Sequence, residues 1–201
     1  GLSFRVAEII RKDIGVSWYG ALYPRPHFKV DYDIDEALVW AISRQESGFN
    51  PRAKSSAKAA GLMQLMPATA SFIARDRGYR GRKRHQLFEP ELNLRLGQNY
   101  IQHLLDEPLV ESSLIRLLAA YNGGPGNLRK WLGKVDHQDD PFLLVESMPA
   151  RETRYYVKNV ISNLGIYRQR FGETTPALSG LAAGNGGKFV PSEAIDKGLA
   201  N

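Results

Sequence analysis

Two short stretches decide the fold: Arg44-Gln45-Glu46-Ser47-Gly48-Phe49-Asn50-Pro51 and Gly61-Leu62-Met63-Gln64-Leu65-Met66-Pro67. The first stretch ends a predicted helix, because residues 37–45 contain no Gly or Pro and Gly48 stands where helices commonly stop. Ile34, Leu38 and Ile42 recur every four residues, which predicts one apolar stripe facing a core. Glu46 is the next position on that stripe.

A carboxyl group at position 46 would point toward apolar surroundings in the last turn of a helix. Burial and the negative end of the helix dipole both disfavour the charged form, so both would raise the pKa of Glu46. A general acid that works near neutral pH needs such a raised pKa. We therefore interpret Glu46 as a buried general acid and residues 61–64 as the wall it faces. The alternative is a solvated residue at the helix end.

Composition limits the other possibilities. The 201 residues, 43% of them hydrophobic, allow one good core and an appendage, and no apolar run is long enough to span a membrane. Cysteine is absent, which excludes disulfides and thiolate metal sites. The net charge of +6 is explained by solubility, or by attraction to an anionic polymer such as nucleic acid or cell wall. Residues 80–85 form a local basic cluster, but no nucleic-acid motif accompanies them.

The chain is predicted to be mainly α-helical, with at most a small strand pair near Gly61. Further helices are expected at about 2–12, from Pro67 to about 77, from Pro90, at 111–121, at 140–148 and at 151–171. Residues 78–89 are expected to form an exposed basic loop, and residues 15–33 a connector rich in aromatics and proline. The Gly- and Ala-rich tail from Gly172 is interpreted as a linker-like extension.

Three polar positions suggest chemistry beyond packing. Gln64 is an amide within an apolar run, and Tyr121 and Asn122 end a helix before a Gly-rich turn. A ligand rich in acetamide groups could supply the partners that a buried amide needs. Structural alternatives stay open: a core amide bonded to the backbone for Gln64, a packed aromatic for Tyr121 and a helix cap for Asn122.

Four segments in the same order resemble the catalytic domain of the soluble lytic transglycosylases, a goose-type lysozyme-like group. They are Arg44-Gln45-Glu46-Ser47, residues 61–70 (Gly-Leu-Met-Gln-Leu-Met-Pro-Ala-Thr-Ala), residues 119–126 (Ala-Ala-Tyr-Asn-Gly-Gly-Pro-Gly) and residues 152–157 (Glu-Thr-Arg-Tyr-Tyr-Val). The resemblance runs from about residue 22 to 171. The domains expected are therefore an N-terminal helix and connector at 1–21, interpreted as the end of an upstream region, a catalytic domain at 22–171 and the extension at 172–201.

The resemblance implies a lysozyme-like helical fold that cleaves peptidoglycan between N-acetylmuramic acid and N-acetylglucosamine. It implies that Glu46 is the sole catalytic carboxylate and that no metal or cofactor is needed. The substrate-binding residues that it implies are Ser55, Gln64, Met66, Tyr121, Asn122, Glu152 and Tyr156. Glu152 is assigned to the substrate groove rather than to a nucleophile. One position departs from the family pattern: Lys58 stands where a glycine is usual, which is awkward if that site requires a positive φ.

A single carboxylate fits substrate assistance, because two-carboxylate glycosidases need a partner and Asp33 and Asp35 lie at the other end of the helix. We expect Glu46 to act first as acid and then as base, forming a 1,6-anhydro ring. The alternatives are a hydrolytic muramidase of the goose type and a non-catalytic peptidoglycan-binding module. The partner expected is the peptidoglycan glycan strand, with other cell-wall proteins left open, no nucleic acid and a monomer favoured. A bacterial periplasmic or envelope location follows from that substrate.

Overall fold

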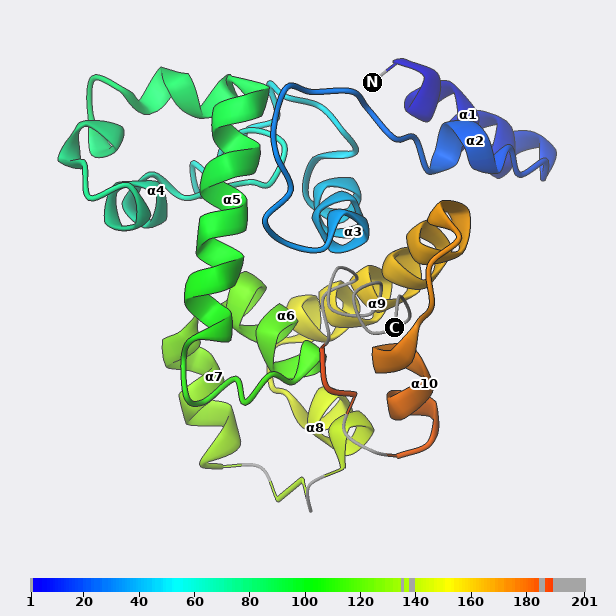
Figure 1. The fold of residues 1–201 in the computed structure, drawn as a ribbon, viewed down its shortest axis with the longest axis vertical. Helices are drawn as coiled ribbons and strands as arrows, with labels where there is room; N and C mark the ends of the chain where they lie inside the picture. Colours follow the sequence, from blue (N-terminus) through cyan, green and yellow to red (C-terminus); the bar gives the residue numbers. More distant parts are fainter. Residues whose placement is uncertain (1, 135, 138–139, 185–186, 190–201) are drawn as a thin grey trace, which may run out of the picture. The chain divides into compact units, whose positions relative to one another are not determined.

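The computed structural model describes residues 2–134, 136–137, 140–184 and 187–189. They form short and medium-length helices joined by loops (Figure 1). The α-helices are α1 (Leu2–Ile14), α2 (Tyr19–Leu22), α3 (Glu36–Ser47), α4 (Pro67–Ile73), α5 (Pro90–Leu105), α6 (Leu114–Gly123), α7 (Pro125–Leu132), α8 (Pro141–Ser147), α9 (Arg151–Phe171) and α10 (Pro176–Ala182). Two 3₁₀ helices, η1 (Arg77–Arg80) and η2 (Arg84–Phe88), lie between α4 and α5.

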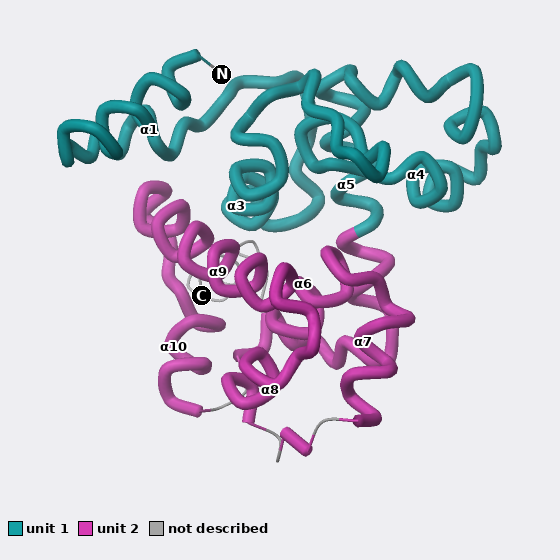
Figure 2. The backbone as a smooth tube through the Cα atoms, turned by 180° about the vertical axis from the view of Figure 1, so that it is seen from behind, with its two compact units in different colours: residues 1–100 teal, residues 101–201 magenta. Residues whose placement is uncertain are grey.

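The chain divides into two compact units, residues 1–100 and 101–201, shown in different colours in Figure 2. The division falls within α5, whereas the sequence places domain boundaries near residues 21 and 171; those boundaries stay a prediction.

The predicted fold class, a mainly α-helical domain, is confirmed. Near Gly61 the described residues contain only isolated antiparallel bridges, from Ala60 to Lys54 and to Leu65, so a tight turn replaces the small strand pair that was allowed for. No helix among the described residues is both long and apolar enough to cross a membrane.

Helix α3 is the central element of the first unit. Asp35 caps its first turn, because its carboxylate accepts a hydrogen bond from Leu38 N at 2.9 Å, and Gly48 ends it in the left-handed conformation at φ 55°. Every side chain from Ala37 to Ser43 is buried. The predicted stripe of Ile34, Leu38 and Ile42 is therefore one part of a helix that is enclosed on all sides through its middle.

The second unit is built around α6 and the long helix α9, which has the predicted bounds. Val157, Val160, Leu164 and Tyr167 of α9 have no exposed surface, as their spacing indicates. In α6 the residues from Leu114 to Tyr121 are buried except for Arg116. Helix α7 packs its Trp131 against Gly123, where a Cβ atom would lie 2.6 Å from the indole ring.

Several element predictions need correction. Helix α4 ends at Ile73 rather than near 77, and 3₁₀ helices occupy most of the expected loop at 78–89. The connector at 15–33 contains α2, and α6 begins only at Leu114 because Glu111 and Ser112 both have positive φ. The expected linker contains α10, whose Ala177 and Leu181 are buried, while residues 190–201 lie outside the described residues.

Candidate active site

Glu46 lies in the last turn of α3, two residues before the Gly48 cap. Its side chain is half-buried, whereas the core of the same helix is fully enclosed. The expectation of a buried carboxyl group is therefore wrong in degree, because the apolar stripe gives way to partial exposure between Arg44 and Gly48. Glu46 is therefore partly open to solvent, while the buried middle of α3 fixes the helix that carries it.

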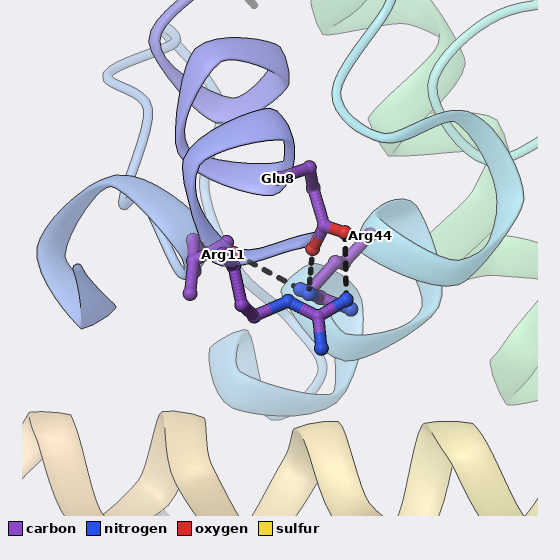
Figure 3. A network of polar contacts seen from close by, with 4 residues as sticks. Glu8, Arg11 and Arg44 are labelled. Carbon is purple, nitrogen blue, oxygen red and sulfur yellow. Dashed lines mark hydrogen bonds and ion pairs between the residues drawn. The ribbon is translucent and has the colours of Figure 1, made fainter. Parts of the chain in front are cut away.

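Arg44 connects this last turn to the N-terminal part of the chain (Figure 3). Its Nη2 atom lies 2.9 Å from Glu8 Oε1 in α1, and its Nε atom donates to the carbonyl oxygen of Leu22 at 3.0 Å. The guanidinium also stacks on the ring of Tyr23, with Cζ 4.4 Å from the ring centroid. Since the other Glu8 oxygen pairs with Arg11 at 2.9 Å, one carboxylate of α1 holds two arginines.

Phe4 of α1 covers the C-terminal end of α3. A Cβ atom added at Gly48 would lie 2.8 Å from the Phe4 ring, and Phe4 packs edge-on against Phe49 with ring centroids 5.4 Å apart. Phe49 has φ 61° and is buried. Glu46 is therefore followed by a turn whose backbone conformation is held by aromatic packing on one side and by the Arg44 network on the other.

The segment from Gly61 to Gln64 is held by α5. Asn93 is fully buried, and its Oδ1 accepts from Met63 N at 2.8 Å while its Nδ2 donates to Ala60 O at 2.9 Å and Leu87 O at 2.8 Å. Gly61 must be glycine here, since it has φ 83° and a Cβ atom would lie 2.3 Å from Asn93 Nδ2. One helical turn further on, a Cβ atom at Gly97 would lie 2.2 Å from the sulfur of Met63.

Gln64 sits at φ 46° and is half-buried. Its amide nitrogen donates to two backbone carbonyls, Ala53 O at 3.1 Å and Gly61 O at 2.8 Å. The nitrogen of Gln64 therefore makes the backbone hydrogen bonds expected of a core amide, which was the structural alternative for this residue. The amide oxygen remains available to a ligand. Met66 is the N-cap residue of α4 and is 40% exposed.

Ser55 closes a tight turn. Its hydroxyl accepts from Ala59 N at 3.0 Å, and its backbone bonds to Ala59 O and Lys58 N at 3.1 and 3.0 Å. Lys58 has φ 75°, so this position does need the left-handed conformation in which glycine is favoured. The lysine side chain is exposed and the turn still closes, so the backbone tolerates the departure from the family pattern.

In the second unit, α6 and α9 bring together three of the four expected residues. The rings of Tyr121 and Tyr156 are stacked with centroids 6.5 Å apart and planes at 7°, and both are buried. Asn122 Oδ1 accepts from the hydroxyl of Thr153 at 2.7 Å. Asn122 is not the helix cap, because α6 continues to Gly123 and Gly124 is the cap. Glu152 lies exposed in the first turn of α9.

The candidate residues thus form two groups. Glu46, Ser55, Gln64 and Met66 belong to the first unit, and Tyr121, Asn122, Glu152 and Tyr156 belong to the second. Among the described residues, no group of three His, Cys, Asp or Glu side chains is placed to hold a metal ion.

Sequence reasoning missed the residues that position these groups, above all Arg44, Asn93 and Thr153. A signal for Asn93 was present, because it is a polar residue between Leu92 and Leu94 in the first turn of a predicted amphipathic helix, and a buried amide there would need a partner. Nothing in the sequence identified that partner as the backbone around Met63.

Comparison with known proteins relates the chain to one family of enzymes. The model of the family described as Transglycosylase SLT domain matches residues 28–142. The soluble lytic murein transglycosylase of Salmonella typhimurium is 41% identical over 150 residues, which is 73% of this chain and 23% of that protein. The 70 kDa soluble lytic transglycosylase of Escherichia coli has a TM-score of 0.73 at 32% identity, covering 85% of this chain and 28% of that one. An inactive glutamate-to-glutamine mutant of the lytic transglycosylase Slt from Pseudomonas aeruginosa has a TM-score of 0.69 at 31% identity, covering 85% of this chain and 30% of that one.

These similarities define a lysozyme-like helical fold of the lytic transglycosylase class. The chain belongs to the Transglycosylase SLT domain family. It spans about a quarter of the length of the soluble relatives that it matches.

Proposed function

We propose that this chain is a peptidoglycan lytic transglycosylase. It cleaves the β-1,4 bond between N-acetylmuramic acid and N-acetylglucosamine without water and leaves 1,6-anhydro-N-acetylmuramic acid ends. The observation that carries the proposal is the position of Glu46, a half-buried carboxyl group at the capped end of a buried helix, within the residues that the family matches.

The other carboxylates on or next to α3 have structural roles. Asp35 caps the helix, and Glu36 accepts hydrogen bonds from Arg25 Nε at 2.8 Å and from the indole nitrogen of Trp40 at 2.9 Å. Both lie at the far end of the helix, roughly 15 Å from Glu46 at about 1.5 Å per residue. This favours a mechanism in which Glu46 is the only catalytic carboxylate on its helix and the substrate supplies the second group.

In the proposed mechanism Glu46 first donates its proton to the glycosidic oxygen as the bond from that oxygen to C1 breaks. The N-acetyl oxygen of the muramic acid stabilises the positive charge that develops at C1. Glu46, now a carboxylate, takes the proton of the C6 hydroxyl while the C6 oxygen forms the new bond to C1. Because attacking and leaving groups belong to the same bound substrate, no water has to be positioned and proximity lowers the entropic cost.

The remaining residues are proposed to bind the glycan strand. The Gln64 amide oxygen and the exposed Met66 side chain would contact the sugars beside the scissile bond, and Ser55 would contact an acetamide group from its turn. In the second unit, Asn122 and Glu152 would offer polar contacts to the glycan, while the buried and stacked Tyr121 and Tyr156 would give this group of residues a rigid aromatic base. A fixed base of this kind reduces the ordering cost of binding.

The proposed partner is the glycan strand of peptidoglycan, with no metal or cofactor and no nucleic acid. A periplasmic or envelope location, a monomeric state and association with other cell-wall proteins belong to the same proposal. The location follows from where the polymer is found.

The test is mass spectrometry of the muropeptides that this chain and its Glu46→Gln variant release from purified sacculi. The variant retains the volume and polarity of the side chain but has no acidic proton to transfer. Products with 1,6-anhydro ends, lost in the variant, would support the proposal, and the inactivity of a glutamate-to-glutamine mutant in the Pseudomonas aeruginosa relative agrees with that expectation. Products with reducing ends would identify a goose-type muramidase. Binding to sacculi without any product would identify a peptidoglycan-binding module.

A further inference from the structure

Positive charge is concentrated in one segment of the chain. Residues 75–84 (Arg-Asp-Arg-Gly-Tyr-Arg-Gly-Arg-Lys-Arg) contain six basic side chains and one carboxylate, a net charge of +5, against +6 for all 201 residues. General solubility does not require this distribution, because the same charge spread over the surface would serve equally well. We call residues 75–84 the basic segment.

The basic segment is folded and not a loose tail. It contains η1 and leads directly into η2, between α4 and α5 in Figure 1. Asp76 caps η1 by accepting from Gly78 N at 2.7 Å, and its other oxygen pairs with Lys83 Nζ at 2.6 Å. The Lys83 ammonium beside it lowers the pKa of Asp76, so this carboxylate stays charged, and the ion pair that it forms is with Lys83. Arg77, Arg80 and Arg82 are exposed and leave most of the positive charge facing solvent.

Tyr79 within the basic segment and Leu87, which follows it, pack this part of the chain against the residues that flank residues 61–64. Tyr79 and Leu87 share one hydrophobic cluster with Ala60 and Leu65, which flank the segment from Gly61 to Gln64. The basic segment and residues 61–64 are thus packed on the same small hydrophobic cluster. A surface fixed in this way loses little conformational entropy when it binds a ligand.

We propose that the basic segment binds the carboxylates of the peptide side chains that peptidoglycan carries. The proposal rests on the proposed function, because it takes the glycan strand as the ligand of the neighbouring site. The segment adds an electrostatic attraction for the peptide-bearing polymer that the sugar-binding residues do not supply, and it distinguishes glycan with peptides from bare glycan.

Peptide carboxylates fit the segment better than a lipid surface does. A protein that docks on a membrane usually inserts exposed apolar side chains, but within residues 75–89 the large apolar groups are turned inward. Tyr79 is 8% exposed and Leu87 is not exposed at all. Arginine can bind a carboxylate through two parallel hydrogen bonds, and three exposed arginines within six residues suit closely spaced carboxylates along one polymer.

The test is binding to purified sacculi, measured by pelleting in the Glu46→Gln background so that no turnover occurs. The variant replaces Arg77, Arg80 and Arg82 with serine. The matched control replaces Arg129, Lys130 and Lys134 with serine, which removes the same charge from exposed positions on and after α7. A third variant replaces the three arginines of the basic segment with lysine and keeps the charge.

We expect the serine variant to bind sacculi at least about fivefold more weakly at low salt, and the control to change by less than about twofold. The lysine variant should recover most of the binding, and the difference should vanish in high salt or on immobilised glycan strands from which an amidase has removed the peptides. Equal losses in variant and control would overturn the proposal, since only net charge would then matter. A loss that persists on peptide-free glycan, or one seen only on vesicles of anionic phospholipid, would also overturn it. The products released by the unmodified chain test the proposed function separately.

Discussion

Replacing Asn93 with alanine should destabilise the first unit more than any ordinary surface change. The Asn93 side chain is fully buried and makes three hydrogen bonds of 2.8 to 2.9 Å to the backbone of Ala60, Met63 and Leu87. Alanine would leave one buried N–H group and two buried carbonyl oxygens without that partner. All three belong to the segments that enclose Gly61 to Gln64.

Ala60 O keeps its hydrogen bond from Leu65 N at 3.0 Å, so the magnitude follows from Met63 N and Leu87 O. A buried backbone group left without a partner costs about 1–3 kcal/mol, so these two groups would cost about 2–6 kcal/mol if no water replaced the amide. A water admitted to the vacated space would recover part of this, which leaves a loss of about 3 kcal/mol as the expected result. That is a large share of the roughly 5–15 kcal/mol that stabilises a typical domain.

Urea unfolding followed by circular dichroism measures this loss as a change in the free energy of unfolding. The matched control is Asn127→Ala, because Asn127 is exposed and makes one hydrogen bond, from Nδ2 to Gly123 O at 2.8 Å. The control should change the free energy by no more than about 0.5 kcal/mol. If Asn93→Ala lowers the free energy of unfolding by less than about 1 kcal/mol, Asn93 is not the residue that holds residues 61–64 in place.

Three further predictions concern other contacts. In a double-mutant cycle with Glu8→Gln and Arg44→Gln, the half-buried pair should give a coupling of about 1 kcal/mol in the free energy of unfolding, and a coupling near zero would remove α1 as a support of the α3 end. Lys58→Gly should leave that free energy unchanged or raise it by up to about 1 kcal/mol, because φ is 75° there, and a clear drop in thermal stability would contradict the strain argument. Burial acts to raise the pKa of Glu36, but hydrogen bonds from Arg25 and Trp40 outweigh it and lower the pKa. The resulting stability is present at neutral pH and is lost as pH falls through that lowered pKa, so Glu36→Gln should flatten the acid side of a stability-versus-pH curve, and identical curves would refute the assignment.

The sequence predicted the features that depend on local spacing. The bounds of α9 and the Gly48 cap were both visible, because each depends on residues within one or two turns. The apolar stripe also placed Glu46 in the last turn of α3. The stripe overestimated the burial of Glu46. The spacing of apolar residues shows which face of a helix points inward, but it does not show how far the neighbouring elements extend along that face.

Features that depend on distant partners were not predictable. Asn93 and Met63 are 30 positions apart and Arg44 and Glu8 are 36 apart, so their contacts exist only once the chain has folded. The tail was interpreted as a linker from its composition, yet Ala177 and Leu181 are buried when α10 packs. Composition describes what a segment could bury, and the surface available to receive it is set elsewhere in the chain.

The central claim is that Glu46 transfers a proton within the substrate and does not activate water. The most direct measurement is digestion of sacculi in water enriched in oxygen-18, followed by mass spectrometry of the muramic acid ends. The account predicts 1,6-anhydro ends with no oxygen-18 from the first turnover onward, and no products from Glu46→Gln. Reducing ends that carry one oxygen-18 atom would show that water reaches C1, and the claim would then be wrong.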